Sequence, residues 1–259
     1  ALYLLYRLVS ILDAYLSYSS VPHRFIYHKL PDLHDSVELG SLMAVNKCKR
    51  MVQIGVGDAT FAKRLIQHWH NLERYYGVDN FRTKMSLIKS EEMRELVATE
   101  RKNLDDPDEG LESALDYLQD YAHKVTLLRT TSSGALNLID DYSLDLVYLN
   151  NHTDFCSTWR DLKLYWPKLK YGGIMAGSNY LRLIKQTVAA SAGEDESKYL
   201  RLLDYKHELC SNGSTFLGVR EAVDEFVRLN HIFEYKLTFR DESNRQTFYF
   251  MKRFHLLIE

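Results

Sequence analysis

The stretch MVQIGVGDATFAKRL, residues 51–65, decides the fold. It begins within a short apolar run over residues 50–55, which predicts a buried β-strand. It ends within a predicted helix over residues 60–73. Two glycines, Gly55 and Gly57, lie in the turn between them, where they let the backbone turn tightly and approach a ligand closely. The amide groups at the start of the helix would point at that ligand.

The next segment, YYGVDN at residues 75–80, predicts a second strand that ends at a carboxylate. Asp79 lies at the distance along the chain from the glycine turn that a ribose-binding carboxylate takes. Such a side chain can accept hydrogen bonds from both ribose hydroxyls. Alternatively, Asp79 is a turn or cap residue, since Asn80 follows it. The glycine turn and Asp79 together favour a ribose-containing ligand.

Strands and helices alternate along the rest of the chain. Strands are predicted over residues 124–130, 144–150 and 172–180, and helices over residues 84–102, 109–123, 132–140, 157–168 and 218–230. Two alternating strands around ESNR, residues 242–245, predict a closing hairpin. This order predicts a parallel sheet with helices on both faces and an added antiparallel strand. Ligands of such sheets bind at the carboxyl ends of the strands.

The length of 259 residues fits one large α/β domain with a helical appendage. We expect an N-terminal helical extension over residues 1–46 and the α/β domain over residues 47–259. The extension carries an amphipathic stripe: Leu2, Leu5, Val9, Leu12 and Leu16. This stripe either packs on its own domain or forms the seam of a homodimer. Arg7 and Asp13 interrupt the apolar residues, so we expect neither a membrane span nor a signal peptide.

Charge and cysteine content restrict the partners and the compartment. The formal net charge is -2, so no global basic field attracts nucleic acid or an anionic membrane. The three cysteines, Cys48, Cys156 and Cys210, are far apart and form no CxxC pair. We therefore expect idle thiols, no zinc site, no disulfide framework and a reducing, cytoplasmic location.

Four blocks resemble the class I S-adenosylmethionine-dependent methyltransferases. They read MVQIGVGDATFAKRL, YYGVDNF, LDLVYLNNHTDFCSTWRDLKLYWPKLKYGGIMAGSNY and GVREAVDEF, and the resemblance covers residues 48–252. They are most similar to the subgroup with a GVD second strand and a GGIxAGxxY fifth strand. The resemblance implies a Rossmann-like, seven-stranded mixed sheet. It also implies S-adenosylmethionine as cofactor and methyl transfer to a small-molecule acceptor.

The resemblance also implies roles for individual cofactor-binding residues. Gly55 and Gly57 would flank the methionine moiety, and Asp79 would hold the ribose. The remaining cofactor contacts would come from Gln53 at the end of the first strand, Phe81, Thr131 and Ser132 around the adenine, and Asn150 facing the methyl-transfer site. Thr131 and Ser132 can equally be read as a helix N-cap, and both roles can hold together.

Three departures from the family pattern remove charge from the expected site. Gln53 stands where the family usually has Glu, Asn150 where it usually has Asp, and Ser178-Asn179 where it usually has a His-Asp or Asp-Asp pair. In the metal-dependent relatives these carboxylates hold a divalent cation. Because hard cations prefer charged oxygen ligands, we expect no catalytic metal.

His152 and Asp154 are the candidate catalytic residues. Methyl transfer to a hydroxyl requires a base, and His152 with Asp154 behind it can serve; alternatively, His152 caps the next helix or faces solvent. The polar segment 181–213 predicts a mobile lid over the acceptor or, alternatively, a surface loop with no role. Two rival functions remain: a degenerate fold used for binding or scaffolding, and a nicotinamide-dependent oxidoreductase. Thr60, at the third fingerprint position, disfavours the latter.

Overall fold

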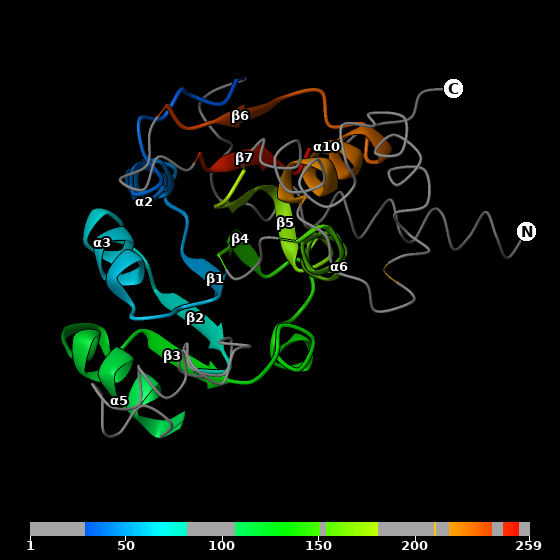
Figure 1. Cartoon of the computed structure of the whole chain (residues 1–259). Coiled ribbons are helices and arrows are strands. Elements are labelled where there is room, and N and C mark those ends of the chain that lie inside the picture. Colours follow the sequence, from blue (N-terminus) through cyan, green and yellow to red (C-terminus); the bar gives the residue numbers. More distant parts are fainter. Residues whose placement is uncertain are drawn as a thin grey trace, which may run out of the picture.

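The computed structural model describes residues 29–81, 107–150, 154–180, 210, 218–239 and 246–253. Seven strands form one mixed sheet in the order β3-β2-β1-β4-β5-β7-β6 (Figure 1). They are β1 Arg50–Ile54, β2 Arg74–Asp79, β3 Val125–Arg129, β4 Leu144–Leu149, β5 Leu169–Gly177, β6 Tyr235–Leu237 and β7 Phe248–Met251. The seven-stranded mixed sheet expected from the sequence is confirmed.

The pairing of the strands places the ligand-binding edge of the sheet. β1 pairs in parallel with both β2 and β4, and β3 and β5 extend the parallel part on either side. β7 runs antiparallel between β5 and β6, as expected for the closing hairpin. The chain passes from β1 outward to β2 and β3 and then returns to β4. The switch in strand order therefore lies between β1 and β4, and ligands of such sheets bind beside this point.

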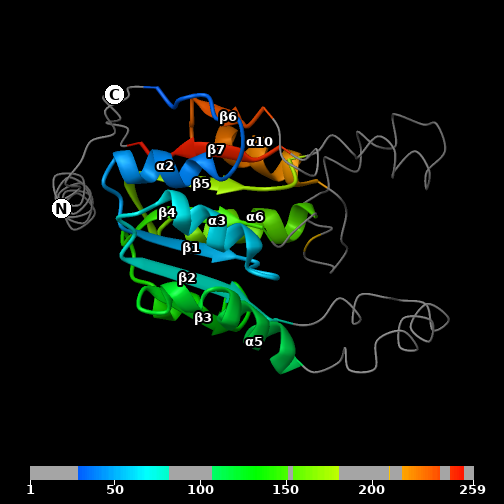
Figure 2. The same ribbon diagram turned by 90° about the vertical axis from the view of Figure 1, so that its left-hand side faces the viewer.

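Helices cover both faces of the sheet (Figures 1 and 2). Helices α2, α3 and α5 pack on one face through residues such as Leu39, Leu65 and Ala114, and α6 and α10 pack on the other through Leu162 and Val223. The helices are α2 Glu38–Val45, α3 Thr60–His68, α5 Pro107–Tyr117, α6 Phe155–Tyr165 and α10 Val219–Leu229, with short 3-10 turns η2 Gln119–Tyr121 and η3 Leu136–Leu138. The two apolar layers explain why the central strands β1 and β4 are buried on both faces and mostly apolar.

Strand β4 shows how the sequence serves both layers. All six of its residues are buried. Leu146 and Tyr148 join the core under α2, α3 and α5, whereas Val147 and Leu149 join the core under α6 and α10. Successive side chains of a strand point to opposite faces, so the apolar run Leu146–Leu149 fits a strand that is covered on both faces.

Residues 29–46 pack into the same core as the sheet. Leu39 and Met43 of α2 are fully buried in one cluster with Met51 of β1. The Tyr249 hydroxyl donates to the Pro31 carbonyl at 2.8 Å and accepts from the Leu33 amide at 3.2 Å. The domain boundary at residue 46 stays a prediction. The apolar stripe in residues 2–16, with its homodimer alternative, lies outside the described residues.

Two helix predictions had other outcomes. The helix expected over residues 132–140 is a turn followed by the short η3. The Thr131 hydroxyl accepts the Gly134 amide at 3.1 Å, which is the contact of an N-cap residue, but only the short η3 follows. The helix expected over residues 84–102 lies outside the described residues, as does segment 181–213 apart from Cys210. Among the described residues, no helix is long and apolar enough to cross a membrane.

The expectation of three idle thiols is wrong. Cys156 in the first turn of α6 forms a disulfide with Cys210, at a Cα–Cα distance of 5.4 Å and a sequence separation of 54. The fold brings the chain that follows β5 back to α6, and cysteine spacing alone cannot show this. Cys48 is a free thiol, and burial raises its pKa, with a smaller contribution from Asp145.

Candidate functional site

The turn after β1 has the conformation that its glycines predict. Gly55 and Gly57 have φ angles of 85° and 57°, in the left-handed region that favours glycine. A Cβ atom built on Gly57 would meet no atom within 4 Å, so the space in front of this turn is open. The turn therefore offers backbone to a ligand at close range, at the switch point between β1 and β4.

Asp79 lies against this turn. Its Oδ2 accepts the backbone amides of Val56 at 2.8 Å and Gly57 at 2.9 Å, and its Oδ1 accepts the Phe81 amide at 2.9 Å. The side chain is half-buried at the end of β2. The structure thus brings together the glycine turn and the carboxylate that the sequence predicted to share one site. A carboxylate has about four acceptor positions, so this one keeps capacity for a ligand hydroxyl.

Gln53 supports the turn from below. Its side chain is fully buried, its Nε2 donates to the Gly55 carbonyl at 2.7 Å, and its Oε1 accepts the Tyr75 hydroxyl at 2.9 Å. Burial raises the pKa of Tyr75, so its phenol stays protonated and donates this bond. The amide of Gln53 therefore bonds to protein at both ends. Its direct contact with the cofactor stays a prediction.

Asn150 and Ser178 extend this contact across the sheet. The Asn150 Nδ2 donates to the Gly55 carbonyl at 3.3 Å, and the Ser178 hydroxyl donates to the Asn150 Oδ1 at 2.7 Å. The ends of β1, β4 and β5 are thus joined by neutral side chains. Sequence reasoning found Gln53, Asn150 and Ser178 separately but did not predict that they would bond around one carbonyl.

Phe81 contributes its backbone more than its ring. The residue is 4% exposed, and its ring belongs to the core on the α5 side of the sheet. A Cβ atom on Gly110 of α5 would lie 3.0 Å from the Phe81 carbonyl oxygen, so helix and turn are in close contact there. The ring exposes little surface to a ligand, and its role beside the adenine stays a prediction.

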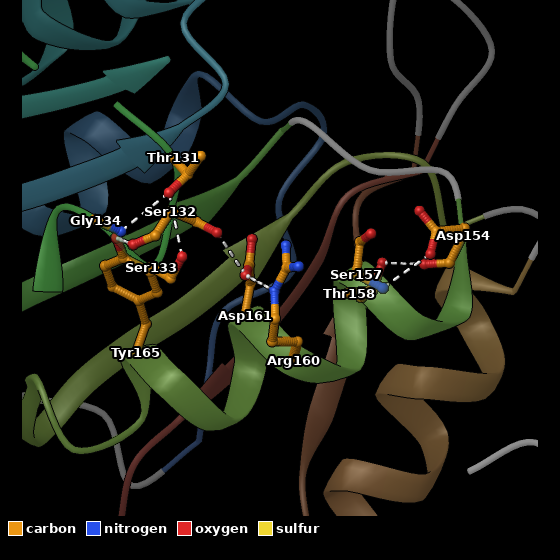
Figure 3. A network of polar contacts seen from close by, with 10 residues as sticks. All are labelled: Thr131, Ser132, Ser133, Gly134, Asp154, Ser157, Thr158, Arg160, Asp161 and Tyr165. Atoms are coloured by element: carbon orange, nitrogen blue, oxygen red, sulfur yellow. Dashed lines mark hydrogen bonds and ion pairs between the residues drawn. The ribbon is translucent and has the colours of Figure 1, made fainter. Parts of the chain in front are cut away.

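Thr131 and Ser132 follow β3 and face different ways (Figure 3). Thr131 is exposed, and its hydroxyl accepts the Gly134 amide and contacts the Ser133 hydroxyl at 3.1 Å. Ser132 is 7% exposed, and its hydroxyl donates to Asp161 of α6 at 2.8 Å. The turn thus lies at the carboxyl edge as predicted, but the Ser132 side chain points to α6.

Asp154 is the N-cap of α6. Its Oδ1 accepts the Ser157 amide at 2.8 Å, and its carbonyl accepts the Thr158 hydroxyl at 2.7 Å (Figure 3). A carboxylate here satisfies amide groups that the first helical turn leaves free. His152 lies outside the described residues. The catalytic roles of His152 and Asp154 stay predictions.

Some of the backbone strain lies at the same edge of the sheet, whereas Lys47, Tyr142 and His231 have positive φ angles elsewhere. Ala59, Phe81 and Asn179 follow β1, β2 and β5, and they have φ angles of 61°, 51° and 64°. Residues other than glycine rarely adopt this region, which costs on the order of 1–3 kcal/mol each. Such strain is concentrated at functional sites, so it supports the placement of the site.

Sequence reasoning missed Tyr75, Asp161 and Tyr165. Asp161 and Tyr165 did leave a signal, because they share the spacing of the apolar residues of α6. The buried residues of this helix are Phe155, Thr158, Asp161, Leu162 and Tyr165. A carboxylate on the buried stripe of an amphipathic helix requires a partner. In the described part of the chain, no three His, Cys, Asp or Glu residues are grouped as metal ligands.

Comparisons with known proteins define the class of fold. No protein-family model and no curated protein sequence matches the chain. A solved structure from Corynebacterium glutamicum is 12% identical with a TM-score of 0.51, covering 96% of this chain and 92% of that one. Cofactor-bound Rv0187 from MTB is 11% identical with a TM-score of 0.50, covering 94% and 90%.

An O-methyltransferase family protein from Burkholderia thailandensis is also similar. It is 11% identical with a TM-score of 0.50, covering 84% of this chain and 55% of that one. Identities this low show the fold alone. The chain therefore has the Rossmann-like fold of the methyltransferases, as expected from the sequence.

Proposed function

We propose that the protein transfers a methyl group from S-adenosylmethionine to a small-molecule acceptor without a divalent metal. One observation carries this function: the Asp79 carboxylate bonds to the amides of Val56 and Gly57 in the glycine turn. The carboxylate that we propose binds the ribose thus lies against the close-approach turn, at the switch point. The subgroup with GVD and GGIxAGxxY strands belongs to the same proposal.

The occupied amides favour S-adenosylmethionine over a dinucleotide. A pyrophosphate needs the amides of the glycine turn as donors. Here the Asp79 Oδ2 already accepts two of them, at 2.8 and 2.9 Å. A phosphate placed there would meet a carboxylate of the same charge. A nucleoside ligand without phosphate avoids this repulsion.

The chemistry of the donor set supports metal independence. The Asn150 Oδ1, at the position where the metal-dependent relatives have a carboxylate, accepts the Ser178 hydroxyl at 2.7 Å. Neutral amide and hydroxyl oxygens are weak ligands for hard cations. We expect a chelator to leave activity unchanged. Activity that is lost with the chelator and restored by magnesium would refute metal independence.

The chemical class of the methyl acceptor is the least constrained part of the proposed function. We propose a hydroxyl acceptor, since one similar structure is that of an O-methyltransferase family protein. Transfer to a hydroxyl needs a base that takes the proton as the oxygen attacks the sulfonium methyl, and His152 is our candidate. His152→Ala should then lower kcat about 100-fold with little change in cofactor affinity.

A specific observation favours a second candidate, a degenerate fold that binds or scaffolds. Gln53 and Asn150 both donate to the Gly55 carbonyl, Ser178 donates to Asn150, and none of the three side chains carries a charge. A site that has lost its charged groups can retain a ligand without the chemistry. Binding without turnover would identify this function.

Calorimetry with three ligands separates the candidates. We expect S-adenosylmethionine and S-adenosylhomocysteine to bind, and NAD not to bind. Transfer of labelled methyl groups to a panel of hydroxyl compounds then distinguishes an enzyme from a scaffold. Tight binding of NAD alone would overturn the proposed function in favour of an oxidoreductase.

A further inference from the structure

A buried carboxylate on α6 holds the turn after β3. Asp161 is fully buried, and its Oδ1 accepts the Ser132 hydroxyl at 2.8 Å and the Arg160 Nε at 3.1 Å (Figure 3). The Arg160 side chain is 52% exposed, so Ser132 is the buried one of these two partners. A buried carboxylate is expensive unless it is bonded, which makes the Ser132 bond a strong constraint.

The same helix holds the backbone of Ser132. The Tyr165 hydroxyl donates to the Ser132 carbonyl at 2.7 Å. Burial, and to a smaller extent Asp161, raises the pKa of Tyr165, so this hydroxyl stays protonated. Asp161 and Tyr165 lie four residues apart and therefore on one side of α6. The helix thus fixes both the side chain and the carbonyl of Ser132.

The turn held in this way lies beside Asp79. Arg129, at the end of β3, lies opposite Asp79 in the register of the β2–β3 strand pair. The Thr130 amide donates to the Asp79 carbonyl at 3.1 Å. The residues that follow, Thr131, Ser133 and Gly134, are exposed. A base attached to a ribose at Asp79 would have this turn as its neighbour.

We infer that Asp161 is a positioning residue for the nucleoside: through Ser132, it fixes turn 131–134 where the base attached to the Asp79-bound ribose lies. This inference rests on the proposed function for its ligand. The position of the turn itself does not depend on that function. The positioning role of Asp161 and the proposed function can therefore be tested by two separate measurements.

Asp161→Ala and a matched control test the role. Asp145→Asn is the control, because Asp145 is also a buried carboxylate, but it accepts the Lys49 and Arg50 amides at the opposite edge of the sheet. We expect Asp161→Ala to weaken S-adenosylhomocysteine binding about tenfold by calorimetry, because the ligand must then order the turn that the Ser132–Asp161 bond holds in the wild type. Asp145→Asn should leave affinity unchanged, although both variants lose stability.

Hydrogen exchange measures the turn without a ligand. Asp161→Ala should speed exchange of the Gly134 and Ala135 amides, and Asp145→Asn should not. Ser132→Ala combined with Asp161→Ala should cost no more affinity than Asp161→Ala alone, because the two residues act through one bond. Unchanged exchange and affinity in Asp161→Ala would overturn the positioning role. Wild-type protein that binds no S-adenosylhomocysteine would instead refute the proposed function.

A second inference comes independently from the disulfide between Cys156 and Cys210. The remaining thiol, Cys48, precedes β1 at the amino edge of the sheet, whereas Cys156 lies at the carboxyl edge. Burial raises the pKa of Cys48, and only a thiolate attacks a disulfide. Cys48 therefore does not attack the disulfide between Cys156 and Cys210.

We propose that the protein folds in an oxidising compartment, where protein disulfides form and persist. The expectation of a cytoplasmic location depended on three unpaired cysteines. Because two of them form a disulfide, that argument no longer applies. Maleimide applied to intact source cells before lysis tests this. After denaturation in the same reagent, the intact mass should show one adduct, on Cys48. Three adducts would mean that the pair is reduced in the cell, and would overturn the proposal.

Discussion

At the residue scale, Asp79 has one observed role and one proposed role, and Asp79→Ala removes both. The substitution removes the acceptor of the Val56 and Gly57 amides and the proposed partner of the ribose hydroxyls. We expect cofactor affinity to fall by about 1.5–3 kcal/mol for each charge-assisted bond lost. Calorimetry with S-adenosylhomocysteine measures this, with Asp58→Ala as the control in the same turn. Unchanged affinity would remove Asp79 from the site.

Gln53 gives a residue-scale prediction about stability. Gln53→Glu replaces the donor to the Gly55 carbonyl with a carboxylate oxygen in a fully buried position. We expect a loss of about 3 kcal/mol in the free energy of unfolding, larger than for Gln53→Met, which buries no charge. Urea denaturation of both variants measures the difference. If Gln53→Glu is more stable than Gln53→Met, the hydrogen bond from Gln53 to the Gly55 carbonyl is contradicted.

The sequence could identify these residues but not their contacts. Gly55, Gly57 and Asp79 were predictable because strand ends and a left-handed turn follow from local pattern. The partner of Ser132 was not, because Asp161 lies on a helix that reaches it only after the sheet has formed. Nor could composition show that Asp154 bonds to its own helix.

At the scale of elements, α6 depends on its N-cap. Asp154→Ala should lower the free energy of unfolding by about 1 kcal/mol, because the Ser157 amide loses its acceptor. Asp154→Asn should retain most of that stability, since asparagine caps helices as well. If the asparagine variant is stable but loses methyl-transfer activity, Asp154 also has the catalytic role; equal activity would limit it to capping.

Lys252 joins the end of β7 to the end of α6 and predicts a pH dependence. It is 4% exposed and donates to the Trp166 and Leu169 carbonyls, each at 2.8 Å, and burial lowers its pKa to about 8. Between about pH 8 and 10.4 the unfolded chain binds a proton that the folded one does not, so stability rises with pH. Relative to Lys252→Met, the wild type should gain about 1 kcal/mol per pH unit there in urea denaturation. If the difference in stability between the wild type and Lys252→Met does not change with pH, the lowered pKa of Lys252 is contradicted.

At the scale of the whole molecule, the disulfide is the main long-range constraint outside the sheet. It closes a loop with a sequence separation of 54, which predicts a stabilisation of about 4 kcal/mol from the lost freedom of the unfolded chain. Cys156→Ser with Cys210→Ser should lower the free energy of unfolding by about that amount, and reductant should act likewise on the wild type. Cys48→Ser is the control. Because Cys48 is not part of the disulfide, this substitution should leave the disulfide's contribution to the free energy of unfolding unchanged.

The architecture was more predictable than this cross-link. Apolar runs and turn residues determine strands and helices locally, and the rules of chain connection then leave few topologies. Which cysteines meet depends on the path of the chain between β5 and α10, and no periodicity records that path. The expectation of idle thiols failed for this reason.

The bond between Cys156 and Cys210 also makes part of the backbone dispensable for keeping the chain in one piece. A protease that cuts one peptide bond between the two cysteines leaves the two fragments covalently joined. Strand β5, which lies inside this ring, then keeps its connection to α10 through sulfur as well as through the sheet. A nicked molecule would therefore retain its full mass until a reductant separates the fragments.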